Sequence, residues 1–164
     1  GVVLATILFC KTNKINLFAF ADQIAIVSPM GLFFGRIANF INGELWGGES
    51  TLPWAIKFPG GGEIYRHPSQ LYEALGEGLI LFLILNWVYH RTDAKKYPGL
   101  VTGVFFIGYG FARFMIEFIR EPDAHLGRFW DIITMGQILS LPMIAIGLGF
   151  IFFGLQKEAK FNLK

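Results

Sequence analysis

An arginine, two asparagines and a glutamate stand close together in the run from Gly35 to Gly47, and their residue types suit a polar binding site. The run closes an apolar stretch that begins near Ile24, so these side chains are expected at or near membrane depth. An arginine there costs about 2.5–3.5 kcal/mol on insertion scales and usually faces a cavity or a partner. We therefore predict a polar site inside a membrane protein. Its first members are Arg36, Asn39, Asn42 and Glu44.

Helical spacing brings part of this run onto one face. Arg36 and Asn39 lie one turn apart, and Gly43 continues the row. A glycine or Asn39 also recurs at every fourth position from Gly31 to Gly47, which would let a helix or a lipid headgroup approach the backbone closely. The alternative is a glycine-rich packing seam with an incidental arginine that reaches toward the membrane surface.

A second polar group lies near the end of a later apolar segment. Tyr109, Arg113 and Glu117 follow one another at four-residue intervals, so they share one stripe of a helix, and Arg120 comes one turn later. Arg113 and Glu117 are expected to pair, which is how buried charges are usually tolerated. The group is either part of the site or a structural ion pair between two helices.

A third group surrounds the predicted start of another helix at Pro68. His67 precedes the proline, and Glu73 and Glu77 follow within the helix. Acidic side chains near a helix N-terminus interact favourably with its dipole, so capping and anchoring explain much of this pattern. In the functional interpretation, His67 is a proton acceptor or Glu73 is the partner of a buried arginine.

Arginine has a planar fork that suits bidentate contacts with phosphate, and the abundant phosphate of a bilayer is the lipid headgroup. Arg36 and Arg113 lie at intermediate depth on separate predicted helices. The residues alone therefore indicate a membrane protein that handles phospholipid. They leave open whether the lipid is moved, bound or chemically altered.

The composition predicts an all-α, polytopic integral membrane helical bundle. Hydrophobic residues make up 54% of the chain, mean hydropathy is +0.51, and only 16% of residues are charged, against about 25% in soluble domains. Apolar segments of about 20 residues can cross the hydrocarbon core as helices. We predict one transmembrane domain over 1–164, with an outward loop at 46–68. The predicted spans are 1–10 (partial), 24–45, 71–90, 99–119 and 136–156.

The first apolar segment, Gly1 to Cys10, is only half a span long. It has no basic leader and does not read as a signal peptide. We therefore predict that this segment is the second half of a transmembrane helix, with functional residues further upstream. Cys10, the one cysteine, leaves no internal disulfide and no Cys-based metal site.

Lys and Arg residues predict the orientation. If the segments alternate, eight basic residues share one side and four share the other, which places the larger group and the C-terminus in the cytoplasm. Loops 47–68 and 120–135 then face outward, where Trp46, Trp54 and Phe58 suit the headgroup interface. A net charge of +2 without a basic aromatic patch gives no indication of nucleic acid. The eight are Lys11, Lys14, Arg91, Lys95, Lys96, Lys157, Lys160 and Lys164; the four are Lys57, Arg66, Arg120 and Arg128.

Four blocks of this sequence resemble the bacterial prolipoprotein diacylglyceryl transferases. They occur in the order of that family and cover about Gly31 to Pro142. The family has an earlier His-Gly-Gly motif and further N-terminal helices that this sequence lacks, so the resemblance is to the C-terminal part. The blocks are Gly35 to Gly47; His67 to Glu73; Gly108 to Arg113 with Glu117, Phe118, Arg120, Glu121, Pro122 and Asp123; and Met135 to Ser140.

The resemblance implies transfer of the diacylglyceryl group of phosphatidylglycerol to the lipobox cysteine of a prolipoprotein, at the outer face of the bacterial cytoplasmic (inner) membrane. It implies that Arg36 and Arg113 bind the phosphate and that Asn39 and Glu44 bind the glycerol headgroup. The thiol's base is His67 or the upstream family histidine, and no metal or organic cofactor is implied. Further binding residues implied are Gly47, Glu73, Tyr109 and Glu117.

Two other classes of function fit the same residues. An anionic-phospholipid transporter or flippase would bind lipid through the arginines without bond chemistry, although no paired half-helices of an inverted repeat are evident. A structural membrane protein would use the charges only to join helices. It would then tolerate lysine at Arg36 but lose its fold with alanine there.

Overall fold

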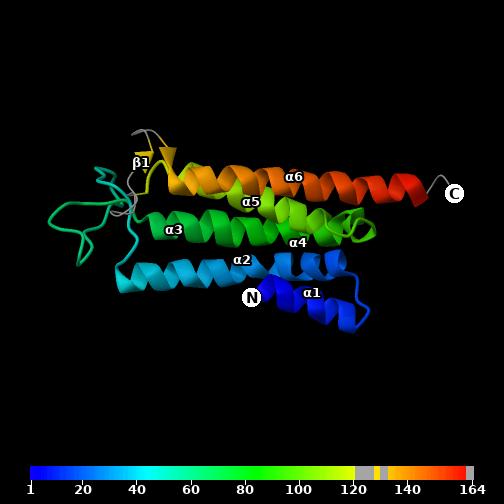
Figure 1. Ribbon diagram of the computed structural model, residues 1–164. Coiled ribbons are helices and arrows are strands. Elements are labelled where there is room, and N and C mark those ends of the chain that lie inside the picture. Colours follow the sequence, from blue (N-terminus) through cyan, green and yellow to red (C-terminus); the bar gives the residue numbers. More distant parts are fainter. Residues whose placement is uncertain (121–127, 130–132, 162–164) are drawn as a thin grey trace.

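The protein folds as a bundle of helices with one pair of two-residue strands (Figure 1). The computed structural model describes residues 1–120, 128–129 and 133–161. The helices run roughly along a common direction, and their connections gather at the two ends of the bundle. The elements are α1 (Val2–Thr12), α2 (Leu17–Asn42), α3 (Ser69–Glu73), the π-helical η1 (Ala74–Ile80), α4 (Leu81–Arg91), the 3₁₀ turn η2 (Asp93–Lys96), α5 (Leu100–Ile116), β1 (Arg128–Phe129), β2 (Ile133–Thr134) and α6 (Met135–Phe161).

Local signals explain both ends of α2. The Asn16 side chain accepts hydrogen bonds from the backbone N–H groups of Phe18 and Ala19, so the helix begins well before the predicted start at Ile24. It ends at Asn42 because Gly43 adopts a left-handed conformation, with φ of 67°. The predicted row of small residues therefore leaves the helix at Gly43. A Cβ on Gly31 or Gly35 would meet nothing within 4 Å, so no other helix of the described chain approaches these two glycines closely. Approach of a lipid headgroup there stays a prediction.

Helices α3, η1 and α4 form one continuous rod that begins after Pro68, as predicted. Its middle turns are π-helical, a form that is rare and often found at functional sites. Here the rod touches α2 closely, since a Cβ on Gly78 would lie 2.7–3.1 Å from Phe33 atoms that include its backbone. The glycine thus permits the crossing that brings η1 against α2.

Helices α5 and α6 pack along their length through a pair of glycines. A Cβ on Gly103 would lie 2.7 Å from the carbonyl oxygen of Gly147, and the reverse distance is the same. The buried Asp22 of α2 fixes the start of α5, because its carboxylate accepts hydrogen bonds from the Gly99 N–H and from both the N–H and the hydroxyl of Thr102. A small core of Ile26, Leu81, Leu85, Ala94 and Val101 lies between α2, α4, η2 and α5.

The outer surfaces of these helices are apolar, as in a membrane bundle. Val27, Leu83, Trp87 and Phe152 are each more than half exposed, and only a bilayer or a partner would cover so many such side chains. In the described part of the chain, three helices are long and apolar enough to cross a membrane: Leu17–Asn42, Ser69–Arg91 and Met135–Gln156. Helices α1 and α5 are apolar but shorter. Which of the predicted spans cross the bilayer stays a prediction.

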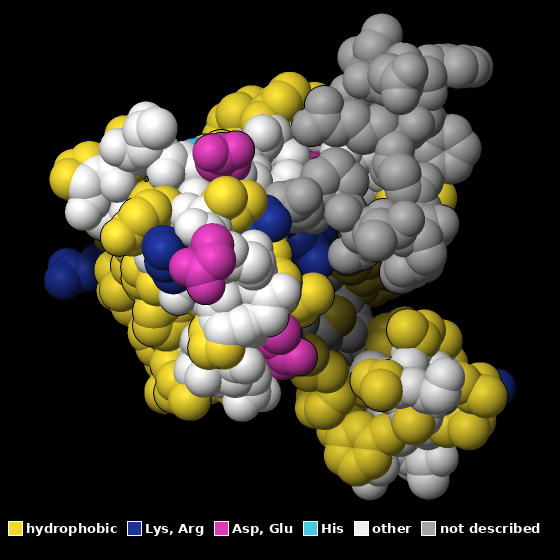
Figure 2. Space-filling view, turned by 90° about the vertical axis from the view of Figure 1, so that its left-hand side faces the viewer, with side chains coloured by type: hydrophobic (Ala, Val, Ile, Leu, Met, Phe, Trp, Pro, Cys, Tyr) yellow, Lys and Arg dark blue, Asp and Glu magenta, His cyan; other side chains and the backbone are white. Residues whose placement is uncertain are grey.

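The connections place described basic residues at both ends of the bundle, and which end faces outward stays a prediction. The α1–α2 turn and η2 lie at one end of the bundle, with Lys11, Lys14, Lys95 and Lys96, while the long 43–68 loop lies at the other (Figure 1). Figure 2 looks onto the loop end, where acidic and basic side chains gather. The side chains of Arg128, Lys157, Lys160 and Lys164, and residues Glu121, Pro122 and Asp123, lie outside the part of the chain that can be described.

Candidate active site

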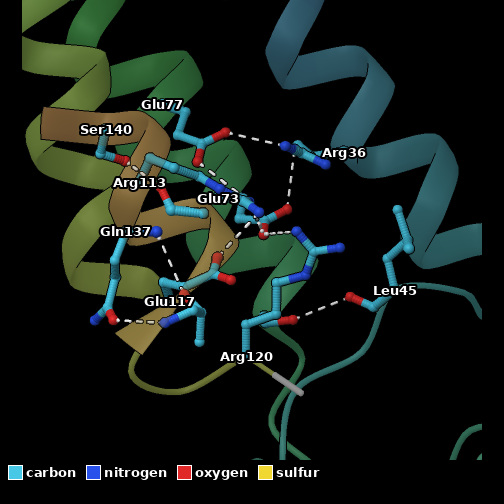
Figure 3. Close-up of polar contacts among 12 residues, drawn as sticks. Arg36, Leu45, Glu73, Glu77, Arg113, Glu117, Arg120, Gln137 and Ser140 are labelled. Atoms are coloured by element: carbon cyan, nitrogen blue, oxygen red, sulfur yellow. Dashed lines mark hydrogen bonds and ion pairs between the residues drawn. The ribbon is translucent and has the colours of Figure 1, made fainter. Parts of the chain in front are cut away.

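Two glutamates of the continuous rod are the centre of a buried charged cluster near the loop end. Glu73 ends α3 and Glu77 lies in η1, and both side chains have zero exposed area. The two residues are four positions apart, so both carboxylates lie on the same side of the rod, where they contact Arg36 of α2 and Arg113 of α5. Figure 3 shows them between the arginines of those two helices.

Arg36 reaches this cluster from α2. Its Nε lies 2.9 Å from Oε2 of Glu73, and its Nη2 lies 3.2 Å from Oε2 of Glu77. The side chain is 17% exposed and sits about 9 Å from the end of α2, at 1.5 Å of rise per residue. The contact with Glu77 is a hydrogen bond, whereas the contact with Glu73 is an ion pair in which Oε2 accepts no hydrogen bond. Nη1 has no partner among the residues described.

Arg113 reaches the cluster from α5 and contacts the acids through its two terminal nitrogens, Nη1 and Nη2. Its Nη1 lies 2.9 Å from Glu73 Oε1 and 3.8 Å from Glu77 Oε1, and its Nη2 lies 3.0 Å from Glu117 Oε2. Arg120 adds a longer contact, 3.9 Å from its Nη1 to Glu73 Oε1. The pairing of Arg113 with Glu117, expected from their spacing, is therefore present, and Glu73 is indeed the partner of a buried arginine.

The cluster has three arginines and three glutamates, so its formal charge is zero. Each arginine contacts at least one glutamate within 4 Å, and none of the six side chains is more than 17% exposed. Charges at this depth persist only when paired, and the network provides that pairing. Glu77 and Arg120 belong to two of the polar groups named from the sequence, but neither was assigned a role in the site.

The start of α6 closes one side of the cluster. Thr134 and Gln137 cap this helix reciprocally, with hydrogen bonds of 3.2 and 3.3 Å between each backbone N–H and the other side chain. A Cβ on Gly136 would lie only 2.5 Å from the carboxylate of Glu117. The acid thus lies against the N-terminal turn of α6, where the helix dipole favours negative charge.

The predicted motif residues after α2 are hydrogen-bonded to the start of α3. The hydroxyl of Ser69 donates to the carbonyl of Leu45 at 3.1 Å, and the Gln70 amide donates to the carbonyl of Glu44 at 2.6 Å. Gly47 is buried between the segments that contain His67 and Ile119. The backbone around Glu44 and Gly47 is therefore fixed to the start of α3 and to the end of α5.

Three other predicted residues take no part in the ion pairs. Asn39 is half-buried, Glu44 is exposed, and the Tyr109 ring is stacked on Phe105 at 6.0 Å between centroids. No side-chain hydrogen bond from Asn39 or Tyr109 is present among the described residues. Their predicted contacts with a headgroup stay predictions.

His67 lies in a separate hydrogen-bonded chain. The indole N–H of Trp54 donates to the Tyr72 hydroxyl at 2.7 Å, and this hydroxyl lies 3.3 Å from Nδ1 of His67. Tyr72 can donate its own proton to that nitrogen, in which case Nε2 of the neutral imidazole carries the ring proton.

The described residues contain no group of three or more His, Cys, Asp or Glu side chains placed to hold a metal ion.

Comparison with known proteins decides the family. The model of the prolipoprotein diacylglyceryl transferase family matches residues 1–153. The chain belongs to this family. A phosphatidylglycerol–prolipoprotein diacylglyceryl transferase of Rhizobium meliloti is 55% identical over 149 residues, which cover 90% of this chain and 53% of the relative. Proteins with the same name from Pseudoalteromonas translucida and Rhodospirillum rubrum are 53% and 50% identical and cover 98% of this chain, with 59% and 58% of their own lengths aligned.

The chain therefore spans a little over half the length of these diacylglyceryl transferase relatives. Family membership and the apolar helices together indicate an integral protein of the inner membrane. The charged cluster of Arg36, Glu73, Glu77, Arg113, Glu117 and Arg120 lies within the matched residues.

Proposed function

We propose that this chain provides the phosphate-binding part of an enzyme that transfers the diacylglyceryl group of phosphatidylglycerol to the lipobox cysteine of a prolipoprotein. The observation that carries the proposal is the buried cluster around Glu73, with the Nη1 side of the Arg36 guanidinium left without a protein partner among the described residues. Family membership supports the reaction class. The cluster lies at the loop end, which the distribution of Lys and Arg assigns to the outer face.

The proposed transfer reaction requires cationic groups next to the phosphate of the lipid. The cysteine sulfur forms a bond to a saturated glycerol carbon, the bond from that carbon to a phosphate oxygen breaks, and glycerol phosphate leaves with the electron pair. Negative charge grows on the departing phosphate. Preorganised donors at low dielectric stabilise such charge strongly. Arg36 and Arg113 supply them in this proposal, with Asn39, Glu44 and Tyr109 around the glycerol headgroup.

The thiol proton needs an acceptor, because the thiolate is the nucleophile and a free cysteine has a pKa near 8.5. His67 is the candidate within this chain, and a histidine of the upstream family motif is the other. For His67 to accept the proton at Nδ1, its contact with Tyr72 must break. Replacement of His67 by Asn should then lower turnover, whereas unchanged turnover would assign the base to the upstream histidine.

The test is lipidation of a lipobox peptide by this chain. We would use the chain itself and a chimera in which it replaces the matching segment of the Pseudoalteromonas translucida relative. Each is incubated in vesicles of phosphatidylglycerol with the peptide, and the cysteine is examined for the added diacylglyceryl mass and the medium for glycerol phosphate. Movement of intact lipid without either product would instead support a lipid transporter.

Arginine variants of the chimera separate a binding site from a structural ion network. Replacement of Arg36 or Arg113 by Ala should lower turnover about 100-fold or more in folded protein. Lysine should restore little, because it lacks the planar fork. If Arg36→Lys kept full activity, the arginine would only join helices, and the headgroup assignment would be wrong.

A further inference from the structure

Glu77 has no place among the residues that the family resemblance connects with the reaction, yet it is fully buried against Arg36 and Arg113. We propose that Glu77 is a positioning residue for the transfer reaction: it fixes the plane of the Arg36 guanidinium so that the Nη1 side faces the lipid phosphate. The inference deepens the proposed function and rests on it.

The atoms that pair define which edge of Arg36 is open. Nε and Nη2 lie on the same edge of a guanidinium, and here they approach the carboxylates of Glu73 and Glu77, at 2.9 and 3.2 Å. Only the contact of Nη2 with Glu77 is a hydrogen bond, since Oε2 of Glu73 accepts none. Glu77 is therefore the acid whose directed contact orients the plane of the guanidinium. The opposite side, with both N–H groups of Nη1 and the second N–H of Nη2, has no partner among the residues described. This is the fork that a phosphate accepts in a bidentate contact.

Arg113 is oriented differently, so the two arginines are not equivalent. Both of its terminal nitrogens face carboxylates, Nη1 toward Glu73 and Glu77 and Nη2 toward Glu117. Only its Nε lacks a partner in the described part of the chain. Of these two arginines, Arg36 is therefore the one whose terminal fork has no partner among the described residues. The residue that orients Arg36 then affects phosphate geometry more than a residue that orients Arg113.

The two oxygens of Glu77 divide this role. Oε2 accepts the hydrogen bond from Arg36 Nη2, while Oε1 is buried, 3.8 Å from Arg113 Nη1, and accepts no hydrogen bond. The contact with Arg36 is thus the directed one. An amide oxygen at this position can still accept that bond, and an apolar side chain of similar length cannot. Substitution of Glu77 can therefore separate the effect of its negative charge from the effect of its hydrogen bond with Arg36.

The experiment compares Glu77→Gln with Glu77→Met in the chimera. Met keeps the volume of the buried side chain without an acceptor. For folded protein we expect kcat/KM for phosphatidylglycerol to stay within about 3-fold of wild type for Gln and to fall about 10-fold or more for Met, since loss of a directed transition-state contact has such effects. Glu63→Met is the matched control, because the Glu63 side chain is 97% exposed and pairs only with Lys57 in the described structure.

A double-mutant cycle distinguishes positioning from a merely structural role. In an Arg36→Lys background there is no guanidinium plane to orient, so Glu77→Met should lower kcat/KM by no more than about 2-fold further. A structural residue would lower the folded fraction equally in both backgrounds and leave kcat/KM of the folded protein unchanged. That result would overturn the inference.

The remaining outcomes are also decisive. If Glu77→Met does not fold, Glu77→Gln decides alone: a loss of 100-fold in folded protein would mean that the negative charge matters and the directed contact does not. If the wild-type chimera transfers no diacylglyceryl group, the proposed function fails first. Transfer by wild type with an unchanged Glu77→Met variant would refute only the role of Glu77.

Discussion

Gly47 offers the sharpest test of how the outer loop is fixed to the helices. A Cβ there would lie 2.7 Å from His67 Cβ, 2.9 Å from the Ile119 carbonyl oxygen and 3.0 Å from the His67 carbonyl oxygen. None of these atoms can turn away by a change of rotamer. The neighbouring Gly48 is a matched control, because the nearest atom to its Cβ would be 3.7 Å away, an ordinary contact.

The expected loss follows from two effects. Overpacking of a tight site costs about 1–3 kcal/mol. Relief of the clash separates segments joined by two backbone hydrogen bonds, from Gly47 to His67 at 2.9 Å and from His67 to Gly48 at 3.0 Å, each worth about 0.5–1.5 kcal/mol. Gly47→Ala should therefore lower the free energy of unfolding by about 2–6 kcal/mol, and Gly48→Ala by about 0.5 kcal/mol or less.

Both variants remove one glycine, so their effects on the unfolded chain cancel in the comparison. The assay is denaturant unfolding of the chain in detergent micelles, followed by the fluorescence of Trp46 and Trp54 in the same loop. If Gly47→Ala unfolded at the same denaturant concentration as Gly48→Ala, the tight junction would not exist. Loss of phosphatidylglycerol binding with unchanged stability would instead favour the direct substrate contact predicted from sequence.

Two further predictions concern the two ends of the bundle. A cysteine in place of the exposed Glu63 should react with an impermeant thiol reagent from outside intact cells, whereas a cysteine in place of Lys95 should not. The native Cys10 is 2% exposed and should not react in either variant. The reverse labelling pattern would invert the topology. Asp22→Asn should lower the free energy of unfolding by about 1–3 kcal/mol, because asparagine has one acceptor oxygen and loses either the bond from Gly99 or the two bonds from Thr102. Asp93→Asn at an exposed turn is the control and should change the free energy of unfolding little. Denaturant unfolding measures both.

The sequence predicted the helices better than their ends. Hydropathy located the apolar segments, but Asn16 and Gly43 shift α2 toward the N-terminus, and only their capping geometry determines the shift. The π-helical turns of η1 had no signal in the pattern, since hydropathy does not distinguish a π-helix from an α-helix. They arise where Gly78 lets α2 and η1 touch, which is a tertiary contact.

One aromatic residue of the 43–68 loop is more buried than its residue type suggested. Phe58 was expected at the headgroup interface, but it is 5% exposed and stacks on Trp46 at 5.8 Å, with Phe40 on its other edge. Its burial depends on the fold of the 43–68 loop around it. Trp54 is 55% exposed, in keeping with the predicted interface position.

The two interpretations of the arginines, as a binding site and as links between helices, are physically connected. Three unpaired arginines near membrane depth would cost roughly 8–10 kcal/mol together, comparable to the whole stability of a domain. The buried acids Glu73 and Glu77 offset that cost, so they make it possible to hold Arg36 where a lipid phosphate could reach it. A network that pairs every guanidinium completely would leave no donor for the headgroup. In our proposal, the side of Arg36 that no described residue contacts distinguishes this cluster from a purely structural one and supplies the donors that the lipid phosphate needs.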